Sequence, residues 1–181
     1  LIFFNREPVK EDLQRGKNIY YEGSDAKQSA FVQSDIISEL YLNNPAGIDK
    51  NGDKKIQYVM LEGEIKHQDA ILRTEWVIKD LDRKGILMDK RASQIANWDR
   101  GQAKGVMDQW LQEFGEEIGL VISNNDDMAL GAIDSTREAG IDGIIVVGID
   151  GTPAAKEAIE SGELFGTVVC DTDMHAQLLL D

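Results

Sequence analysis

Residues 120–128 read Leu120-Val121-Ile122-Ser123-Asn124-Asn125-Asp126-Asp127-Met128, a short apolar run followed at once by polar residues. An apolar run of this length favours a strand that is buried on both faces. The segment from Met128 onward has a helical pattern, and the same order of strand, polar turn and helix recurs along the chain. Such alternation is typical of an α/β fold, a parallel sheet flanked by helices and joined by right-handed crossovers.

The remaining apolar and amphipathic segments extend this alternation over the whole chain. Gly85, Gly140 and Gly162 follow predicted helices where a left-handed residue is favoured, and Thr152-Pro153 resembles a helix start. We predict strands at Ile2–Phe4, Asn18–Tyr21, Ile56–Leu61, Leu120–Ser123, Ile144–Val147 and Gly166–Val169. We predict helices at Lys27–Leu42, Ala70–Arg83, Gln102–Phe114, Met128–Ala139 and Ala154–Ser161.

The composition limits the classes of ligand. The 181 residues include 33 Asp and Glu against 19 Lys and Arg, a formal net charge of −14. This acidity argues against nucleic acid and anionic membranes as partners, because both need a basic face. It is compatible with a divalent cation, with a neutral polar ligand, or simply with a solvated surface. Cys170 is the single cysteine, so no intrachain disulfide or thiolate metal cluster can form.

Polar residues follow several predicted strands, at the positions where the strands end. Residues 62–69, 124–126 and 170–171 are such segments, and Asp150 follows another apolar run. In open parallel sheets, ligands bind beyond the carboxyl ends of the strands. We therefore expect these segments to converge on one binding edge.

Individual residues at this edge suit hydroxyl recognition, although each has a simpler interpretation. Asp69 and Arg73 are four residues apart at a helix start, so they could clamp adjacent hydroxyls or form an ordinary surface ion pair. Trp98 could stack on a sugar ring or pack in the core. Asn125 and Asp126 could bind a ligand or cap the following helix, and capping is the stronger alternative for Asp126.

Six stretches carry a resemblance to a known family. They are FFNREP, GIDKNGDKKIQYVMLEGEIKHQDAILRT, NWDRGQAKGVMDQW, VISNNDDMALGA, VVGIDGTP and SGELFGTVV. Together they resemble the glucose- and galactose-binding branch of the bacterial type I periplasmic-binding proteins, in the family's order and over nearly the whole chain. The resemblance implies sugar contacts at His67, Asp69, Arg73, Trp98, Asn125 and Asp150. Cys170 stands where the family has a sugar-binding Asn, and a thiol is a poor hydrogen-bonding group.

The loop at residues 49–57 has the spacing of a calcium loop. Asp49, Asn51, Asp53 and Gln57 supply side-chain oxygens, and Lys55 would bind through its carbonyl. The resemblance implies a structural Ca²⁺ held also by a distant Glu, but Gly119 stands at that position and Glu117 lies two residues earlier. Without this carboxylate the site would be weaker or empty, and the alternative is a polar turn that leads into a strand.

The resemblance also implies an architecture and a role. Family members have two α/β lobes that close on a sugar and present the closed form to an ABC permease or a chemoreceptor. We expect residues 1–181 to be mainly the C-terminal lobe, with hinge crossings near 1–8 and 169–173, and the N-terminal lobe to be missing. The chain opens without Met or a signal peptide, so we expect truncation of an exported protein, periplasmic or lipid-anchored outside the cell. Its ligand would be a hexose, galactose or glucose.

Two other functions remain open from the sequence. The same fold serves as the sugar-effector domain of transcriptional repressors of the lac type, which carry DNA-binding helices upstream. An enzyme could use His67, Asp69 and Asp126 as acid/base groups, or Glu62 and Glu64 as a carboxylate pair. No nucleophile elbow, P-loop or dinucleotide fingerprint is present in the sequence, so we expect a binding protein and not an enzyme.

Overall fold

The main body of the protein is a five-stranded parallel sheet. A computed structural model describes residues 1–180, with side chains for all of these except residues 10 and 180. The strand order is β4-β3-β5-β6-β7, and every pairing is parallel. The strands are β3 (Lys55–Glu62), β4 (Leu87–Ile95), β5 (Leu120–Ser123), β6 (Ile145–Asp150) and β7 (Gly166–Val169). The predicted α/β class is therefore confirmed.

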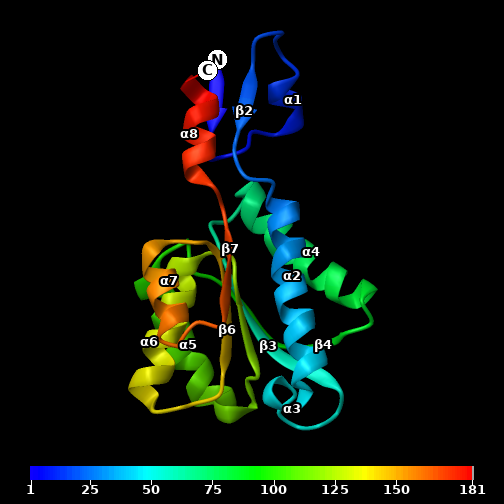
Figure 1. The fold of residues 1–181 in the computed structure, drawn as a ribbon, viewed down its shortest axis with the longest axis vertical. Coiled ribbons are helices and arrows are strands. Elements are labelled where there is room, and N and C mark those ends of the chain that lie inside the picture. The colour runs from blue at the N-terminus through cyan, green and yellow to red at the C-terminus, as the bar shows by residue number, and fades with distance from the viewer. Residues whose placement is uncertain (181) are drawn as a thin grey trace.

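Helices cover both faces of this sheet and create two apolar cores (Figure 1). Alternate residues of β3 divide between them: Val59 and Leu61 belong to one core, and Tyr58 and Met60 to the other. This division follows from the two-residue period of a strand. The helices are α2 (Ala26–Asn43), α3 (Pro45–Ile48) and α4 (Gln68–Arg83) toward one face, and α5 (Arg100–Phe114), the short helix η1 (Gly115–Glu117), α6 (Asp126–Ala139) and α7 (Pro153–Glu160) toward the other.

Strand β4 was not predicted from the sequence. Its residues, LMDKRASQI, are largely polar, and few of its side chains are buried because it lies at the edge of the sheet. The register against β3 shifts between Tyr58 and Val59, which marks a bulge. Charged side chains and bulges protect an exposed edge from pairing with other chains, and the same features hide the strand from a search for apolar runs.

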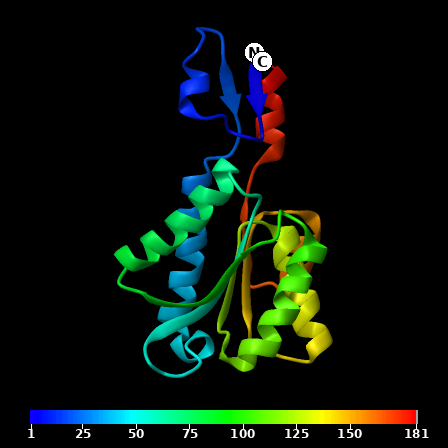
Figure 2. The same ribbon diagram turned by 180° about the vertical axis from the view of Figure 1, so that it is seen from behind.

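A second, smaller layer lies beyond one end of the sheet and contains both ends of the described chain (Figures 1 and 2). Its parallel pair is β1 (Ile2–Phe4) and β2 (Tyr20–Glu22), accompanied by α1 (Lys10–Leu13) and α8 (Thr172–Leu180). Residues 1–8 lie within this layer, and two connections join it to the main body, at residues 23–25 and 170–171. The predicted hinge crossings near 1–8 and 169–173 remain predictions.

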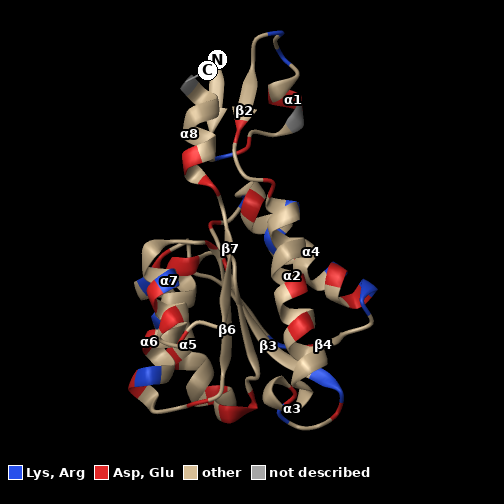
Figure 3. Cartoon of the chain, viewed as in Figure 1, with Lys and Arg blue, Asp and Glu red and all other residues tan. Residues whose placement is uncertain are grey.

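The helix ends have the predicted local chemistry. Thr152 is the N-cap of α7 and accepts from the Ala155 amide at 3.2 Å, with Pro153 at the first helical position. Gly140 ends α6 in the left-handed conformation, at a φ of 65°. Acidic and basic residues are scattered over both layers (Figure 3). No helix among residues 1–180 is long and apolar enough to span a bilayer.

Candidate functional site

The carboxyl ends of four strands bring the six predicted sugar-site residues to one edge of the sheet. His67 and the first turns of α4, with Asp69 and Arg73, follow β3. Trp98 follows β4, Asn125 follows β5, and Asp150 is the last residue of β6. The convergence that the sequence predicts is therefore present, and contact with a ligand remains a prediction for each residue.

Arg73 is the centre of this cluster. Its side chain is only 7% exposed, and Nη1 donates to the Asn124 carbonyl at 2.8 Å. The guanidinium also lies 3.8 Å from the Asp69 carboxylate and 3.5 Å from that of Asp150. Both ion pairs are longer than the usual 2.7–2.9 Å or so of charge-assisted hydrogen bonds, so the carboxylates are not tightly engaged. Asn124, which the sequence analysis did not single out as an anchor, holds the arginine.

The Trp98 indole forms an aromatic wall beside this cluster. It packs on Gly63, where a Cβ would come within 2.2 Å of the ring. The His67 ring meets it edge-on, with centroids 5.1 Å apart, and the Arg73 guanidinium lies 5.9 Å from its centroid. Trp98 has a φ of 64°, a left-handed conformation that few non-glycine residues adopt. The backbone therefore accepts strain to place this ring.

Burial shifts the pKa of three groups in the cluster: His67, Asp69 and Asp150. Burial raises the pKa of Asp150 to about 6, with the Arg73 charge opposing the shift. The pKa of Asp69 is also raised by burial, against the attraction of Arg73. Burial lowers the pKa of His67, which caps α4 by accepting from the Asp69 amide through Nδ1 at 3.3 Å. A neutral His67 and weakly paired carboxylates suit neutral hydroxyl groups.

Asn125, and not Asp126, caps the helix that follows β5, although capping was the stronger expectation for Asp126. Asn125 is the N-cap of α6, with Oδ1 accepting from the Met128 amide at 3.0 Å. Its Nδ2 donates to the Trp98 carbonyl at 3.3 Å and so ties the aromatic wall to the helix start. Asp126 is fully buried and accepts from the Thr152 amide at 2.8 Å and the Thr167 hydroxyl at 2.5 Å. Asp126 therefore fixes the loop after β6 and is not available as an acid or base.

The other two carboxylates considered for catalysis are also engaged separately. Glu62 accepts from the Ser93 hydroxyl, and Glu64 pairs with Arg6 at 3.2 Å. Cys170 does not line the cavity that contains Arg73; it borders a different hollow of about 400 Å³ with Met174 and Val169. The absent Asn contact at position 170 is thus not replaced by the thiol.

A cavity of about 340 Å³ adjoins the cluster, between the sheet edge and the smaller layer. Asp69, Arg73 and Asp150 form one side of it. The other lining residues were not predicted, because they come from the smaller layer and from the two connections: Phe4, Asn5, Glu22, Gly23, Ser24, Thr172, His175, Ala176 and Leu179.

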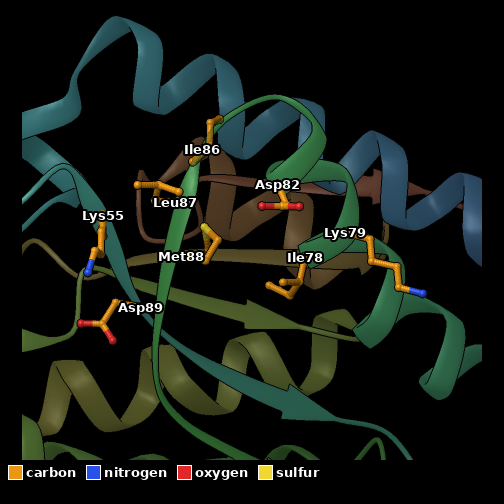
Figure 4. A pocket seen from close by; sticks show the side chains of 8 residues that line it. All are labelled: Lys55, Ile78, Lys79, Asp82, Ile86, Leu87, Met88 and Asp89. Carbon is orange, nitrogen blue, oxygen red and sulfur yellow. The ribbon is translucent and has the colours of Figure 1, made fainter.

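Another hollow lies at the amino ends of β3 and β4 (Figure 4). It is therefore at the opposite end of these strands from the predicted sugar site.

The predicted calcium loop is folded, and its oxygens converge. The side-chain amide nitrogen of Gln57, Nε2, donates to Asn51 Oδ1, Asp53 Oδ1 and the Lys55 carbonyl at 3.0, 3.2 and 2.9 Å. Asp49 instead accepts from two backbone amides of the loop. The donor set therefore suits a hard cation in its oxygen chemistry, provided that the Gln57 amide turns to present Oε1.

A sixth ligand is less well placed. Gly119 cannot be replaced by a longer residue on this backbone, because a Cβ would come within 2.0 Å of the Ile48 carbonyl. Glu117 lines a cavity of about 520 Å³ together with Asn51 and Gln57, and it pairs with Arg91 at 3.4 Å. Glu117 is therefore the available carboxylate, and Arg91 competes for it.

Comparison with known proteins identifies the family. A model of the periplasmic binding protein domain matches residues 1–181, the whole chain. The chain belongs to the periplasmic binding protein family. Members of this family bind substrates for transport and are not enzymes. The chain spans about half the length of the curated relatives it matches, 52% for each of the two described next.

Several proteins similar to this periplasmic binding protein domain have a sugar or a polyol in their names. The D-galactose/methyl-galactoside binding periplasmic protein MglB of Haemophilus influenzae is 40% identical over 173 residues, 95% of this chain. A putative rhizopine-binding protein of Rhizobium meliloti is 33% identical over 94% of the chain. Among solved structures, an ABC transporter solute binding protein of Bacillus halodurans with bound myo-inositol has a TM-score of 0.77 at 34% identity, covering 94% of this chain and 54% of its own.

Proposed function

We propose that this chain is mainly the C-terminal lobe of an extracytoplasmic binding protein that captures a hexose, galactose or glucose, for uptake. The observation that carries the proposal is the cluster of Asp69, Arg73 and Asp150 beside the Trp98 wall, at the edge of a cavity. A sugar hydroxyl both donates and accepts, so an arginine between two carboxylates matches adjacent hydroxyls. An indole face suits the apolar face of the sugar ring.

The proposed ligand is consistent with the name of the galactoside-binding relative from Haemophilus. The proposed partners are the membrane permease of an ABC transporter and a chemoreceptor, both of which would bind the closed form. The proposed location is the periplasm or, with a lipid anchor, the outer face of the cell membrane. Closure of two lobes on the sugar would provide the signal that these partners read.

Titration by protein NMR with galactose, glucose and myo-inositol tests the proposal. We expect residue-specific shifts at Asp69, Arg73 and Trp98 and an affinity weaker than micromolar. One lobe leaves much of a sugar hydrated, whereas bound small ligands usually bury roughly 70–90% of their surface. Asp69→Asn should abolish the shifts, and Asp82→Asn, at an exposed position of the same helix, should not. Absence of shifts in the wild-type chain at millimolar sugar would contradict the proposal.

We also propose that the loop at residues 49–57 binds Ca²⁺ weakly in a structural role. Asp49, Asn51, Asp53, the Lys55 carbonyl and Gln57 would provide five oxygens, below the six to eight or so that Ca²⁺ prefers. Glu117 would complete the shell after release from Arg91. The site lies at the amino end of β3, so the cation would stabilise the fold without contacting the sugar.

A further inference from the structure

The cavity beside Arg73 has a second polar side that comes from the connections between the two layers. Glu22 ends β2, Ser24 lies in the first connection, and His175 lies on α8. All three line the same cavity as Asp69 and Arg73. His175 is 153 positions from Glu22 and 151 from Ser24 in sequence, so only the folded chain brings it to the other two.

Glu22 and His175 form a fixed pair. His175 Nδ1 lies 2.6 Å from a Glu22 carboxylate oxygen, and Nε2 lies 3.2 Å from the Ser24 hydroxyl. The side chains of Glu22 and His175 are 26% and 21% exposed, so both are mostly shielded from water. The imidazole is held at both nitrogens, and it contacts one of the two carboxylate oxygens of Glu22, Oε1. Glu22 lines the cavity, and a carboxylate has acceptor capacity on both oxygens, so it can accept a further hydrogen bond.

Other polar atoms around the cavity also lack partners. Tyr21 Oη, Asp69 Oδ1 and Arg73 Nε are buried without a hydrogen bond within the described structure. Burial, and after it the charge of Asp69, raises the pKa of Tyr21 to about 12. The phenol is protonated at neutral pH and can donate a hydrogen bond. Unpaired buried polar groups are rare in native proteins, because each one loses its hydrogen bonds to water without a replacement. Their concentration here indicates that this end of the cavity accommodates a polar ligand.

We propose that Glu22 accepts a hydrogen bond from one ligand hydroxyl and that His175 orients it for this contact, so that the pair selects ligands by their hydroxyl pattern. The inference rests on the proposed function, in which a hydroxylated ring occupies the cavity. Asp69, Arg73 and Asp150 bind hydroxyls on one side of the ring, and Glu22 accepts a hydrogen bond from a hydroxyl on another side. An ionised carboxylate only accepts, so a ligand without the facing hydroxyl leaves it unpaired.

A coupling experiment tests the contact. Galactose and its monodeoxy analogues are titrated by NMR against the wild-type chain, Glu22→Gln and the exposed control Glu160→Gln. We expect Glu22→Gln to weaken galactose binding about tenfold or more while leaving the affinity for one deoxy analogue nearly unchanged. The control should match the wild-type chain for every sugar. Equal weakening for all sugars, or none for any, overturns the inference.

Two variants at position 175 test the positioning role. Gln can still donate to Glu22 and Leu cannot, so His175→Gln should retain most of the galactose affinity and His175→Leu should reproduce the selective loss of Glu22→Gln. Equal losses in both variants would overturn the role of His175. If Asp69→Asn abolishes binding and Glu22→Gln does not change it, the inference fails and the proposed function stands. If the wild-type chain binds no sugar, both fail.

Discussion

The partly buried carboxylate of Asp150 should lower the stability of the fold at neutral pH while contributing to ligand binding. Asp150 lies at the end of β6 with a φ of 129°, outside the range that L-residues usually adopt. Its carboxylate is 3.5 Å from Arg73, and burial raises its pKa to about 6. We predict that Asp150→Asn raises the free energy of unfolding relative to the wild-type chain, and that this gain is larger at neutral pH than at acid pH. The amide removes a charge that burial disfavours, and Asp150 carries this charge only at the higher pH.

The magnitude follows from the pKa. A folded-state pKa of about 6 against an ordinary value of 3.8 corresponds to at most about 3 kcal/mol above pH 6. About half of this is realistic, about 1–2 kcal/mol, because the Asp150 side chain is 35% exposed. The folded protein binds this proton more tightly than the unfolded chain, so the contribution destabilises the wild-type protein as pH rises from about 4 to 6. Below pH 4 the contribution is absent.

The assay is urea unfolding at pH 4, 5, 6 and 7 of the wild-type chain, Asp150→Asn and the exposed control Asp142→Asn, whose charge does not contribute to the pKa shift of Asp150. The free energy of unfolding of Asp150→Asn, relative to wild type, should rise by about 1–2 kcal/mol between pH 4 and pH 7. The control difference should stay within about 0.5 kcal/mol throughout. The same Asp150→Asn protein should bind galactose about tenfold more weakly. A stability difference that does not change with pH would refute the electrostatic reasoning.

Three further predictions concern other parts of the molecule. Gly119→Ala should lower the free energy of unfolding by about 3 kcal/mol, measured by urea, because its Cβ would meet the Ile48 carbonyl at 2.0 Å; a neutral effect would contradict the packing at this position. Trp98→Ala should reduce galactose affinity at least tenfold while circular dichroism stays unchanged, since the indole is only partly buried and packs at the margin of the core; unaltered affinity would exclude stacking. Saturating Ca²⁺ should raise the thermal midpoint by about 2–4 °C, and Gln57→Leu should remove this shift; an equal shift in both proteins would place the cation elsewhere.

The sheet was predictable because its central strands are apolar runs that need no tertiary information to recognise. Leu120–Ser123 and Gly166–Val169 were predicted with the bounds that the structure has. Strand β4 was not, because an edge strand is selected for charge and against continuous apolarity. Ile2–Phe4 was predicted correctly as a strand, but nothing in the local sequence shows that its partner is β2 and not the main sheet.

The position of the candidate site was predictable where its residues follow strands directly, and not where they depend on pairing across the chain. Spacing placed Asp69 and Arg73 on one helix face but left an ordinary ion pair open. Sugar contact at these two residues and at His67 was implied only by the family resemblance, and it stays a prediction. Glu22 and His175 meet only through folding, and no spacing rule relates residues 153 positions apart. The capping roles of Asn125 and Asp126 were assigned the wrong way round, because either residue can cap and only the position of Thr152 decides between them.

Backbone strain gives an independent reason to place function at the carboxyl edge of the sheet. Among the described residues, the non-glycine positions with positive φ are Asn5, Lys54, Lys66, Asn97, Trp98 and Asp150. All except Lys54 lie at the cavity or in the loops that follow β3, β4 and β6. Each such conformation costs about 1–3 kcal/mol, which only a well-packed surrounding can sustain. The two apolar cores, which stabilise the fold, lie on the faces of the sheet. The strained residues lie mostly beyond the carboxyl ends of the strands, where we propose that the ligand binds.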